Sequence, residues 1–350
     1  MSSIRHLRHA SIQPLTRFIQ SHSPSERGSF DGGVYDSFGQ FCDESRQTKI
    51  RHDHIPGPEP DQCLTLQLQG SYIYGGLLQN THFGHFAAES LTRLWAYRCL
   101  PDSFSCFVFL KRIRAKPVPS YSQQLISLLC PDIKIIGIEK PVYLENLAVP
   151  EAICGGTNGF LVGHQLVKDL VQHLRVPIDG SRVYVSRSRL GMNSGGFLCE
   201  DYLERYLQEE GYRIFHPQEH SLQEQLNVYS RASDLIFADG STLHLYALVC
   251  QPEQRVFVVW RRCVISGFQW QISTFGGPKL LGQPAIHKQW VPQDDPRKTA
   301  RGRAELDFES LHKQLLNAGM IQTLSWSPPE EDVVAGAVSN LGSKLICKSG

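Results

Sequence analysis

The sequence predicts an α/β fold made of two domains that face each other across a crevice. At 350 residues the chain is longer than a single hydrophobic core usually grows. Short apolar runs typical of buried strands alternate with helical patterns, which indicates parallel sheets. The alternation occurs in two series, and the segment Val176–Gly180, with its proline and glycine, is a plausible hinge between them.

The composition is that of a globular protein, with 41% hydrophobic and 20% charged residues. A net charge of +1 argues against broad nucleic-acid binding, which needs a strongly basic surface. No run approaches the ~18 consecutive apolar residues of a transmembrane helix. The 10 cysteines form no C-x-x-C pair, and residues 1–20 lack a secretory apolar core. We therefore expect reduced thiols and a cytoplasmic protein.

Residues 1–60 are rich in serine, histidine, glycine, proline and charge, and we expect them to be loosely ordered. A frayed polar leader is the preferred interpretation of residues 1–20. The same residues place Arg5, Arg8 and Arg17 among apolar positions, which also fits a weak amphipathic helix on a membrane surface. That alternative leaves open a peripheral contact with the inner face of the membrane.

Organised structure is expected to begin near Cys63, in a first domain over residues 61–175. Its strands are predicted where apolar residues alternate or run together, at 64–68, 72–78, 105–110, 133–138 and 142–149. Its helices are predicted at 80–95, 120–129 and 164–175.

The second domain is expected over residues 176–290. Its predicted strands are 182–186, 212–215, 234–238 and 255–260. Its predicted helices are 198–210, 221–232 and 242–249, of which the second opens with a capping box, Ser221 to Glu224. Residues 291–350 are read as a charged linker, an amphipathic helix at 306–318 and a peripheral tail.

The helix predicted over residues 80–95 carries an unusual polar line. His85, Glu89 and Arg93 are spaced i, i+4, i+8, and His82 falls close to the same line. The rest of the circumference is apolar, the reverse of an ordinary surface helix. A cleft wall and a core helix with a satisfied histidine and an edge ion pair fit the pattern equally well.

A strand followed by a helix start is the strongest signal in the second domain. The strand 234–238 runs into Asp239-Gly240-Ser241-Thr242, with His244 one turn further on. In open α/β sheets ligands bind beyond the carboxyl ends of strands, where a helix start offers N–H groups to an anion. A capped helix start without a ligand fits this short pattern as well.

Two arginines follow the strand 182–186. Arg187 and Arg189 stand next to a glycine loop, and the guanidinium fork is well shaped for a pyrophosphate. Solvated loop arginines are the alternative. Glu219 precedes the next helix and is a candidate for ribose hydroxyls. The chain has no D-x-D triplet, no G-x-x-x-x-G-K-[ST] loop and no G-x-G-x-x-G turn, which argues against kinases, P-loop ATPases and ordinary dehydrogenases.

The order of these signals resembles glycosyltransferase family 61. The matching motifs are His85-Phe-x-x-Glu89-Ser-Leu-x-Arg93-Leu-Trp95, Val183-Tyr-Val-Ser-Arg187, Pro217 to Gln225, and Asp239-Gly240-Ser-x-Leu243. The resemblance covers roughly residues 70–265 and is to bacterial members linked to surface polysaccharide. It departs from eukaryotic members at 239–245, where they have His-Gly-Ala-Gly-Leu-Thr-Asn, and at Thr92, where a proline is common.

The resemblance implies two Rossmann-like domains of the GT-B type and an inverting, metal-independent transfer from a nucleotide sugar. We expect a UDP-sugar as co-substrate, a glycan or lipid-linked acceptor, and no permanently bound cofactor. His85 is the expected base, oriented by Glu89. Arg187, Ser241, Thr242 and His244 are expected at the diphosphate. A sugar-nucleotide epimerase of similar fold and a non-catalytic sugar-nucleotide binding protein are the alternatives.

Overall fold

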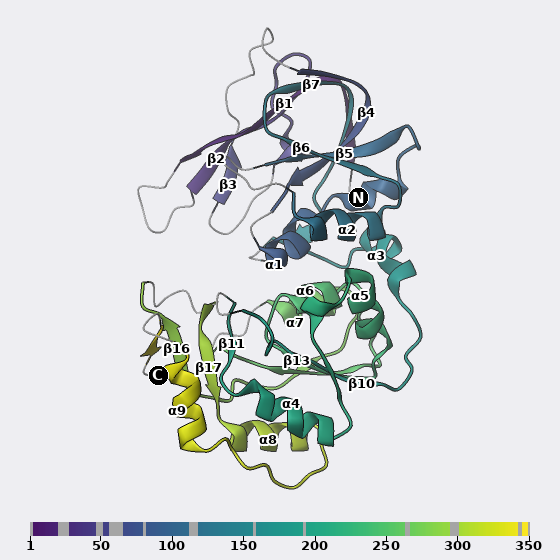
Figure 1. Cartoon of the computed structure of the whole chain (residues 1–350). Coiled ribbons are helices and arrows are strands. Elements are labelled where there is room, and N and C mark those ends of the chain that lie inside the picture. The colour runs from purple at the N-terminus through teal and green to yellow at the C-terminus, as the bar shows by residue number, and fades with distance from the viewer. Residues whose placement is uncertain are drawn as a thin grey trace. The chain divides into compact units, whose positions relative to one another are not determined.

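The computed structural model describes residues 3–19, 28–46, 52–55, 66–79, 82–111, 118–156, 159–191, 194–262, 267–294, 301–341 and 345–348. The chain divides into two compact units, Met1–His173 and Leu174–Gly350. Each unit contains helices and β-sheet (Figure 1), which confirms the predicted α/β class. The predicted cleft and GT-B arrangement stay predictions.

A seven-stranded sheet is the frame of the first unit. In order across the sheet its strands are β3 (His52–Ile55), β2 (Gly28–Tyr35), β1 (Ile4–Ile19), β7 (Val142–Pro150), β4 (Leu66–Leu77), β5 (Phe104–Leu110) and β6 (Lys134–Ile138). β7, β4, β5 and β6 are parallel neighbours, whereas β1 runs antiparallel to β7. The apolar run of β5 is buried, because both faces of such a parallel strand are covered.

Helices connect the parallel strands of the first unit, with one exception. α2 (Ser120–Leu129) has the predicted bounds, and α3 (Gln165–Val171) continues into a 3₁₀ turn, Gln172–Leu174. A short ribbon is formed by β8 (Cys154–Gly155) and β9 (Phe160–Leu161). Only residues 139–141 join β6 to β7, so this connection departs from the helical crossover of a Rossmann-like domain.

The N-terminal residues contribute two strands to this sheet. The prediction of a loosely ordered segment is therefore wrong for residues 4–19 and 28–35, and the alternative of a membrane-surface helix is wrong for 4–19. Ala10 and Ile12 are fully buried, and β1 pairs with β7 over most of its length. The partner strand begins only at Val142, so the local pattern of residues 1–60 contains no sign of this pairing.

The second unit is built on a five-stranded parallel sheet. Its order is β12 (Arg213–Phe215), β10 (Arg182–Val185), β13 (Asp234–Ala238), β14 (Arg255–Val259) and β15 (Leu280–Leu281). Renumbered along the chain, this is the 2-1-3-4-5 order of flavodoxin-like doubly wound sheets. Ligands bind such sheets beyond the carboxyl ends of the strands, where the strand order reverses. That point lies between β10 and β13.

Four helices accompany this sheet. They are α4 (Glu200–Glu209), α5 (Leu222–Arg231), α6 (Thr242–Tyr246) and α7 (Phe268–Thr274). The predicted capping box is present, because the Ser221 hydroxyl accepts from the Glu224 amide and the Glu224 carboxylate accepts from the Ser221 amide. α6 is shorter than the predicted helix over 242–249.

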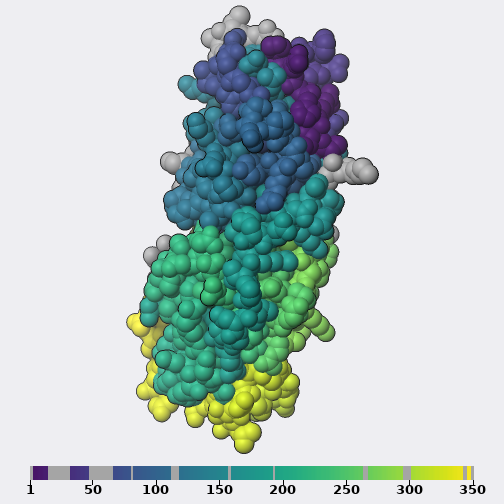
Figure 2. Space-filling model, turned by 90° about the vertical axis from the view of Figure 1, so that its right-hand side faces the viewer, coloured from purple at the N-terminus to yellow at the C-terminus, as the bar shows by residue number. Residues whose placement is uncertain are grey.

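The C-terminal region forms strands as well as the predicted helix. A second, four-stranded sheet contains β11 (Gly196–Phe197), β17 (Arg303–Leu306), β16 (Ile286–Pro292) and β18 (Leu345–Lys348). The amphipathic helix is α8 (Phe308–Asn317), followed by α9 (Glu331–Ser339). α8 shares a hydrophobic core with α4, and Figure 2 shows the yellow C-terminal residues against the green part of this unit. Within the described ranges, no helix is long and apolar enough to cross a bilayer.

Candidate active site

A histidine–glutamate pair follows β4 in the first unit. Nδ1 of His85 lies 2.6 Å from Oε1 of Glu89. The Glu89 side chain is 3% exposed and its other oxygen accepts from Nε2 of Gln79 at 3.1 Å, whereas the His85 side chain is 58% exposed. A buried, anchored carboxylate thus holds a solvent-accessible imidazole by one ring nitrogen. This arrangement fixes the ring and stabilises its protonated form.

The predicted regular helix over residues 80–95 is broken into three types of turn. α1 (Phe83–His85) is followed by a π-helical segment, Phe86–Ser90, and then by a 3₁₀ helix, Leu94–Arg98. Asn80 and Thr81 lie outside the described residues. The His85–Glu89 spacing remains within one turn, but the wider π turn and the irregular residues 91–93 change the direction of later side chains. The polar line therefore does not continue to Arg93.

Arg93 is a structural residue of the first unit. It is 0% exposed, and its guanidinium donates to the carbonyls of Glu44 at 2.7 Å, Arg46 at 2.9 Å and Pro150. It also lies over the ring of Tyr74, with Cζ 5.1 Å from the ring centroid. Arg93 therefore does not pair with Glu89, because its Nη1 and Nη2 donate to backbone carbonyls.

His82 remains close to the pair. It is exposed, and its ring centroid is 6.0 Å from that of His85, at an interplanar angle of 83°.

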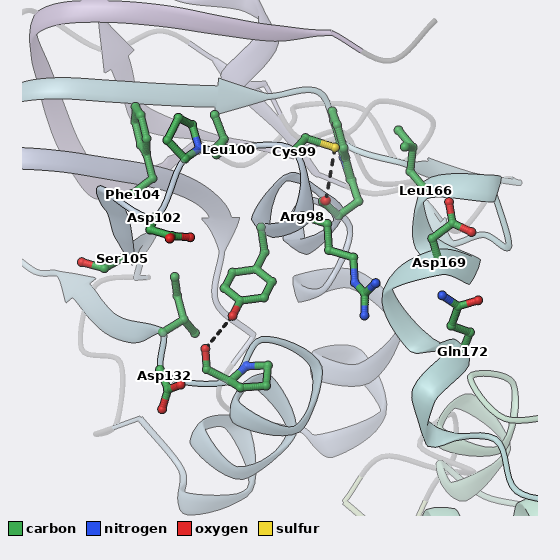
Figure 3. Close-up of a pocket in the computed structure, with 15 residues that line it drawn as sticks. Arg98, Cys99, Leu100, Asp102, Phe104, Ser105, Asp132, Leu166, Asp169 and Gln172 are labelled. Carbon is green, nitrogen blue, oxygen red and sulfur yellow. Dashed lines mark hydrogen bonds between the residues drawn. The ribbon is translucent and has the colours of Figure 1, made fainter.

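A different part of the first unit holds a pocket of about 800 Å³, which is shown in Figure 3. Tyr97, Asp102 and Asp169 are among the residues that line it. In the figure, Arg98 extends toward α3. None of the predicted site residues lines this pocket.

In the second unit, the structure brings together two of the predicted diphosphate residues. Arg187 follows β10, and Gly240 follows the neighbouring strand, β13. The strand order reverses between these two strands. A Cβ on Gly240 would collide with Nη1 of Arg187, so the guanidinium lies directly against this glycine. Nε and Nη2 of Arg187 donate to the carbonyl of Gly195 at 2.9 and 2.8 Å. Burial lowers the pKa of Arg187, and the nearby carboxylates of Glu200 and Asp239 oppose this change.

Asp239 is buried and ion-paired. Its carboxylate accepts from Nε and Nη2 of Arg262 at 2.9 and 2.8 Å, a two-point pair. Its carbonyl accepts from Nε of Arg261 at 2.9 Å. Asp239 is one of the residues predicted to lie in the cleft, and it is 0% exposed and bonded to these arginines.

The helix start after Gly240 holds the remaining candidates. Ser241 and Thr242 are half-buried, whereas His244 is buried. Nδ1 of His244 lies 2.7 Å from Oε1 of Gln271, and its ring contacts Phe268 edge-on. Burial lowers the pKa of His244 to about 4, so the imidazole is neutral at neutral pH.

The two other predicted residues pair with each other. Nη1 of Arg189 lies 3.0 and 3.1 Å from the two carboxylate oxygens of Glu219. Both side chains are exposed, and the Arg189 guanidinium lowers the pKa of the Glu219 carboxyl. Their predicted partners, a pyrophosphate and ribose hydroxyls, would have to compete with this surface ion pair.

Three arginines at this edge of the second unit were missed by the sequence analysis: Arg261, Arg262 and Arg303. The first two follow β14, so the rule of strand carboxyl ends that selected Arg187 selects them as well. Arg303 begins β17, and its Nη2 lies 3.4 Å from the carbonyl of Gly191. No local pattern of residues 291–303 connects it to this site.

The buried carboxylate of Glu200 holds the backbone at Arg187. Oε1 of Glu200 accepts from the Arg187 amide at 2.8 Å, the Tyr184 hydroxyl at 2.8 Å and the Ser186 hydroxyl at 3.1 Å. Burial raises the pKa of Glu200. This network ties the loop after β10 to the first turn of α4 and thereby fixes the backbone that carries Arg187.

Among the described residues, no three His, Cys, Asp or Glu side chains gather into a group that could hold a metal ion.

No curated protein matches the chain. A family model described as Glycosyltransferase 61 matches residues 83–257, half of the sequence, and this range includes both His85–Glu89 and Asp239–His244. The chain therefore belongs to glycosyltransferase family 61, and it is a glycosyltransferase.

Proposed function

We propose that this glycosyltransferase moves a sugar, with inversion and without a metal ion, from a nucleoside-diphosphate sugar to a hydroxyl of a glycan or glycolipid. A UDP-sugar is the favoured donor, and polysaccharide biosynthesis of the bacterial surface type is the favoured role. The observation that carries the proposal is the His85–Glu89 hydrogen bond, in which an exposed imidazole is anchored by a buried carboxylate.

On the acceptor side, His85 acts as the general base. With Nδ1–H donated to Glu89, the ring is held in the tautomer whose basic nitrogen is Nε2, and we assign the proton of the acceptor hydroxyl to that atom. The hydroxyl oxygen bonds to the anomeric carbon as the bond from that carbon to the diphosphate oxygen breaks. The hydroxyl proton passes to Nε2, and the Glu89 carboxylate stabilises the imidazolium that results. A single displacement of this kind inverts the anomeric configuration.

On the donor side, the diphosphate binds beyond β10 and β13 of the second unit. The position of Arg187 against Gly240, where the strand order reverses, supports this assignment. Arg187 and the hydroxyls of Ser241 and Thr242 stabilise the negative charge that develops on the leaving diphosphate. His244 contributes as a neutral ring, because of its lowered pKa.

A thermal-shift panel of UDP, GDP, CMP and their sugars tests the class of donor. Stabilisation by UDP and UDP-sugars, lost in Arg187→Ala, is expected, and an unchanged dissociation constant in that variant would remove Arg187 from the site. Release of UDP that depends on an added acceptor distinguishes transfer from epimerisation. Interconversion of the donor with no acceptor present would instead favour the epimerase, and binding without turnover would favour a non-catalytic protein.

A further inference from the structure

The pocket of the first unit lies at the amino ends of two neighbouring strands. Its lining residues 100–102 lead into β5, and residues 131–133 lead into β6. The His85–Glu89 pair instead follows the carboxyl end of β4, where Gln79, two residues after the strand, binds Glu89. β4, β5 and β6 are parallel neighbours, and the seven residues of β5 span about 20 Å. The pocket and the pair are therefore at opposite ends of one sheet.

One part of the pocket wall is apolar and aromatic. Trp95 and Ile133 are buried in it, and the rings of Tyr97 and Phe104 are half-buried. The Tyr97 hydroxyl donates to the carbonyl of Pro131, in a second lining segment, at 2.7 Å. Because this bond joins two walls of the pocket, the ring is held in place before a ligand arrives. A fixed aromatic ring offers its face to the C–H groups of a sugar ring with little further loss of conformational entropy.

Polar groups line the rest of the pocket. Burial raises the pKa of Tyr97, and the charges of Asp132 and Asp102 add to this rise, which places both carboxylates near the ring. In the described part of the chain, no hydrogen bond or ion pair engages either of these carboxylates. Figure 3 shows Asp169 and Gln172 across the pocket from Asp102 and Asp132. Hydrogen-bonding groups thus face the interior from two sides.

The charge of the lining selects among the possible ligands. Three carboxylates and the single guanidinium of Arg98 give the pocket a formal charge of −2, which disfavours phosphates and other anions. A cation would be repelled by Arg98 and would leave the N–H donors of Arg98 and Gln172 without acceptors. A sugar hydroxyl both donates and accepts, so it suits the carboxylates and these donors together. The lining therefore fits a neutral carbohydrate.

We propose that this pocket is a second carbohydrate-binding site, which holds a neutral glycan chain at the end of the sheet remote from His85. The choice of a glycan as ligand rests on the proposed function. The volume of about 800 Å³ falls within the ~300–1,000 Å³ of small-molecule sites and admits more than a single sugar ring.

The position of the pocket adds a selectivity for length. A glycan that occupies the pocket and also reaches His85 must extend at least along β5. Binding at the pocket raises the effective concentration of the distant end of the chain at the catalytic pair. Long acceptors should therefore have a lower KM than short ones of the same sugar, with an equal kcat, because the pocket takes no part in the chemical step.

The test is titration calorimetry of the full chain with cellohexaose, xylohexaose and chitohexaose, and with hexagalacturonate and spermine as charged comparisons. Binding of at least one neutral hexasaccharide is expected. Asp102→Ala and Asp132→Gly should each weaken it about tenfold, as for the loss of one hydrogen bond to a charged group. Glycine suits position 132 because the backbone there has φ of 61°. Asp43→Ala is the matched control, since Asp43 is an exposed aspartate of the same unit outside the pocket.

Three results would each overturn the inference: no binding of any neutral hexasaccharide, wild-type affinity in both variants, or tighter binding of hexagalacturonate or spermine. Asp102 is exposed and lacks a protein partner, so its alanine variant is expected to fold with the wild-type Tm. The proposed function can fail separately. Glycan binding that depends on Asp102, without sugar transfer from any nucleotide sugar, leaves the pocket standing. Transfer with one KM for short and long acceptors overturns the pocket and leaves the transferase.

Discussion

The guanidinium of Arg187 fills the space beside the Cα of Gly240 that any larger residue would need. The two residues follow neighbouring parallel strands, β10 and β13, at the reversal of strand order. Gly240 is therefore needed for close approach and not for an unusual backbone, because it is absent from the glycines with positive φ in this structure.

Gly240→Ala should separate function from stability. The added methyl group meets the far end of a flexible side chain, so Arg187 can move away at a cost of about 1–3 kcal/mol in unfolding free energy. The displaced guanidinium no longer faces the proposed position of the diphosphate, and UDP binding is expected to fall about tenfold. Urea unfolding and calorimetry measure the two effects. A large loss of stability with normal UDP affinity would contradict this account.

His85→Ala should abolish turnover and leave nucleotide binding intact. The side chain is 58% exposed, so its removal costs little stability. Loss of a general base typically slows a reaction ~10²–10⁴-fold. Glu89→Gln keeps the shape of the side chain but removes its charge and should also lower kcat. The exposed His6 of the same unit provides the control, since His6→Ala is expected to transfer sugar at the wild-type rate.

Much of the second unit follows from local sequence patterns. The runs 182–186, 234–238 and 255–260 correspond to β10, β13 and β14, and the capping box at Ser221 begins α5 as predicted. These elements are short, strongly patterned and bounded by turn or cap signals, which is where such patterns are most informative.

The remainder depends on contacts between distant segments. The π-helical segment Phe86–Ser90 has an apolar pattern that a regular helix would also satisfy. The sequence pattern therefore predicts Arg93 on the same helix face as His85 and Glu89, whereas the Arg93 side chain is buried elsewhere in the unit. Arg303 reaches the glycine loop only because β17 pairs with β11. Neither relationship leaves a signal within a window of a single helix or strand.

Arg93→Met should destabilise the first unit without a direct effect on the proposed diphosphate site. The change removes the donor to the partly buried carbonyls of Glu44 and Arg46 and to the buried carbonyl of Pro150. We expect a loss of about 3 kcal/mol or more in unfolding free energy, as for a broken buried network. Urea unfolding measures this loss, and Arg98→Met, at an exposed position of the same segment, is the comparison. Equal midpoints for the two variants would show that the carbonyl contacts contribute little.

Acid should destabilise the second unit through His244. Its pKa is about 4 in the folded protein against about 6.5 for an ordinary histidine, so the unfolded chain binds more protons between these values. The contribution of His244 to stability is therefore constant above about pH 6.5 and falls as the pH drops toward 4, by about 3 kcal/mol in full. His244→Asn should flatten the dependence of Tm on pH in this window. A parallel pH profile in that variant would assign the effect to other groups.

The pairing of β1 with β7 has a consequence for synthesis on the ribosome. β1 is translated well before the strand that it borders, Val142–Pro150, which emerges more than a hundred residues later. Until then β1 can pair only with β2, and a two-stranded ribbon is marginally stable in water. During this interval β1 is an exposed strand without its neighbour β7, which is the stage at which a chaperone would have most to protect.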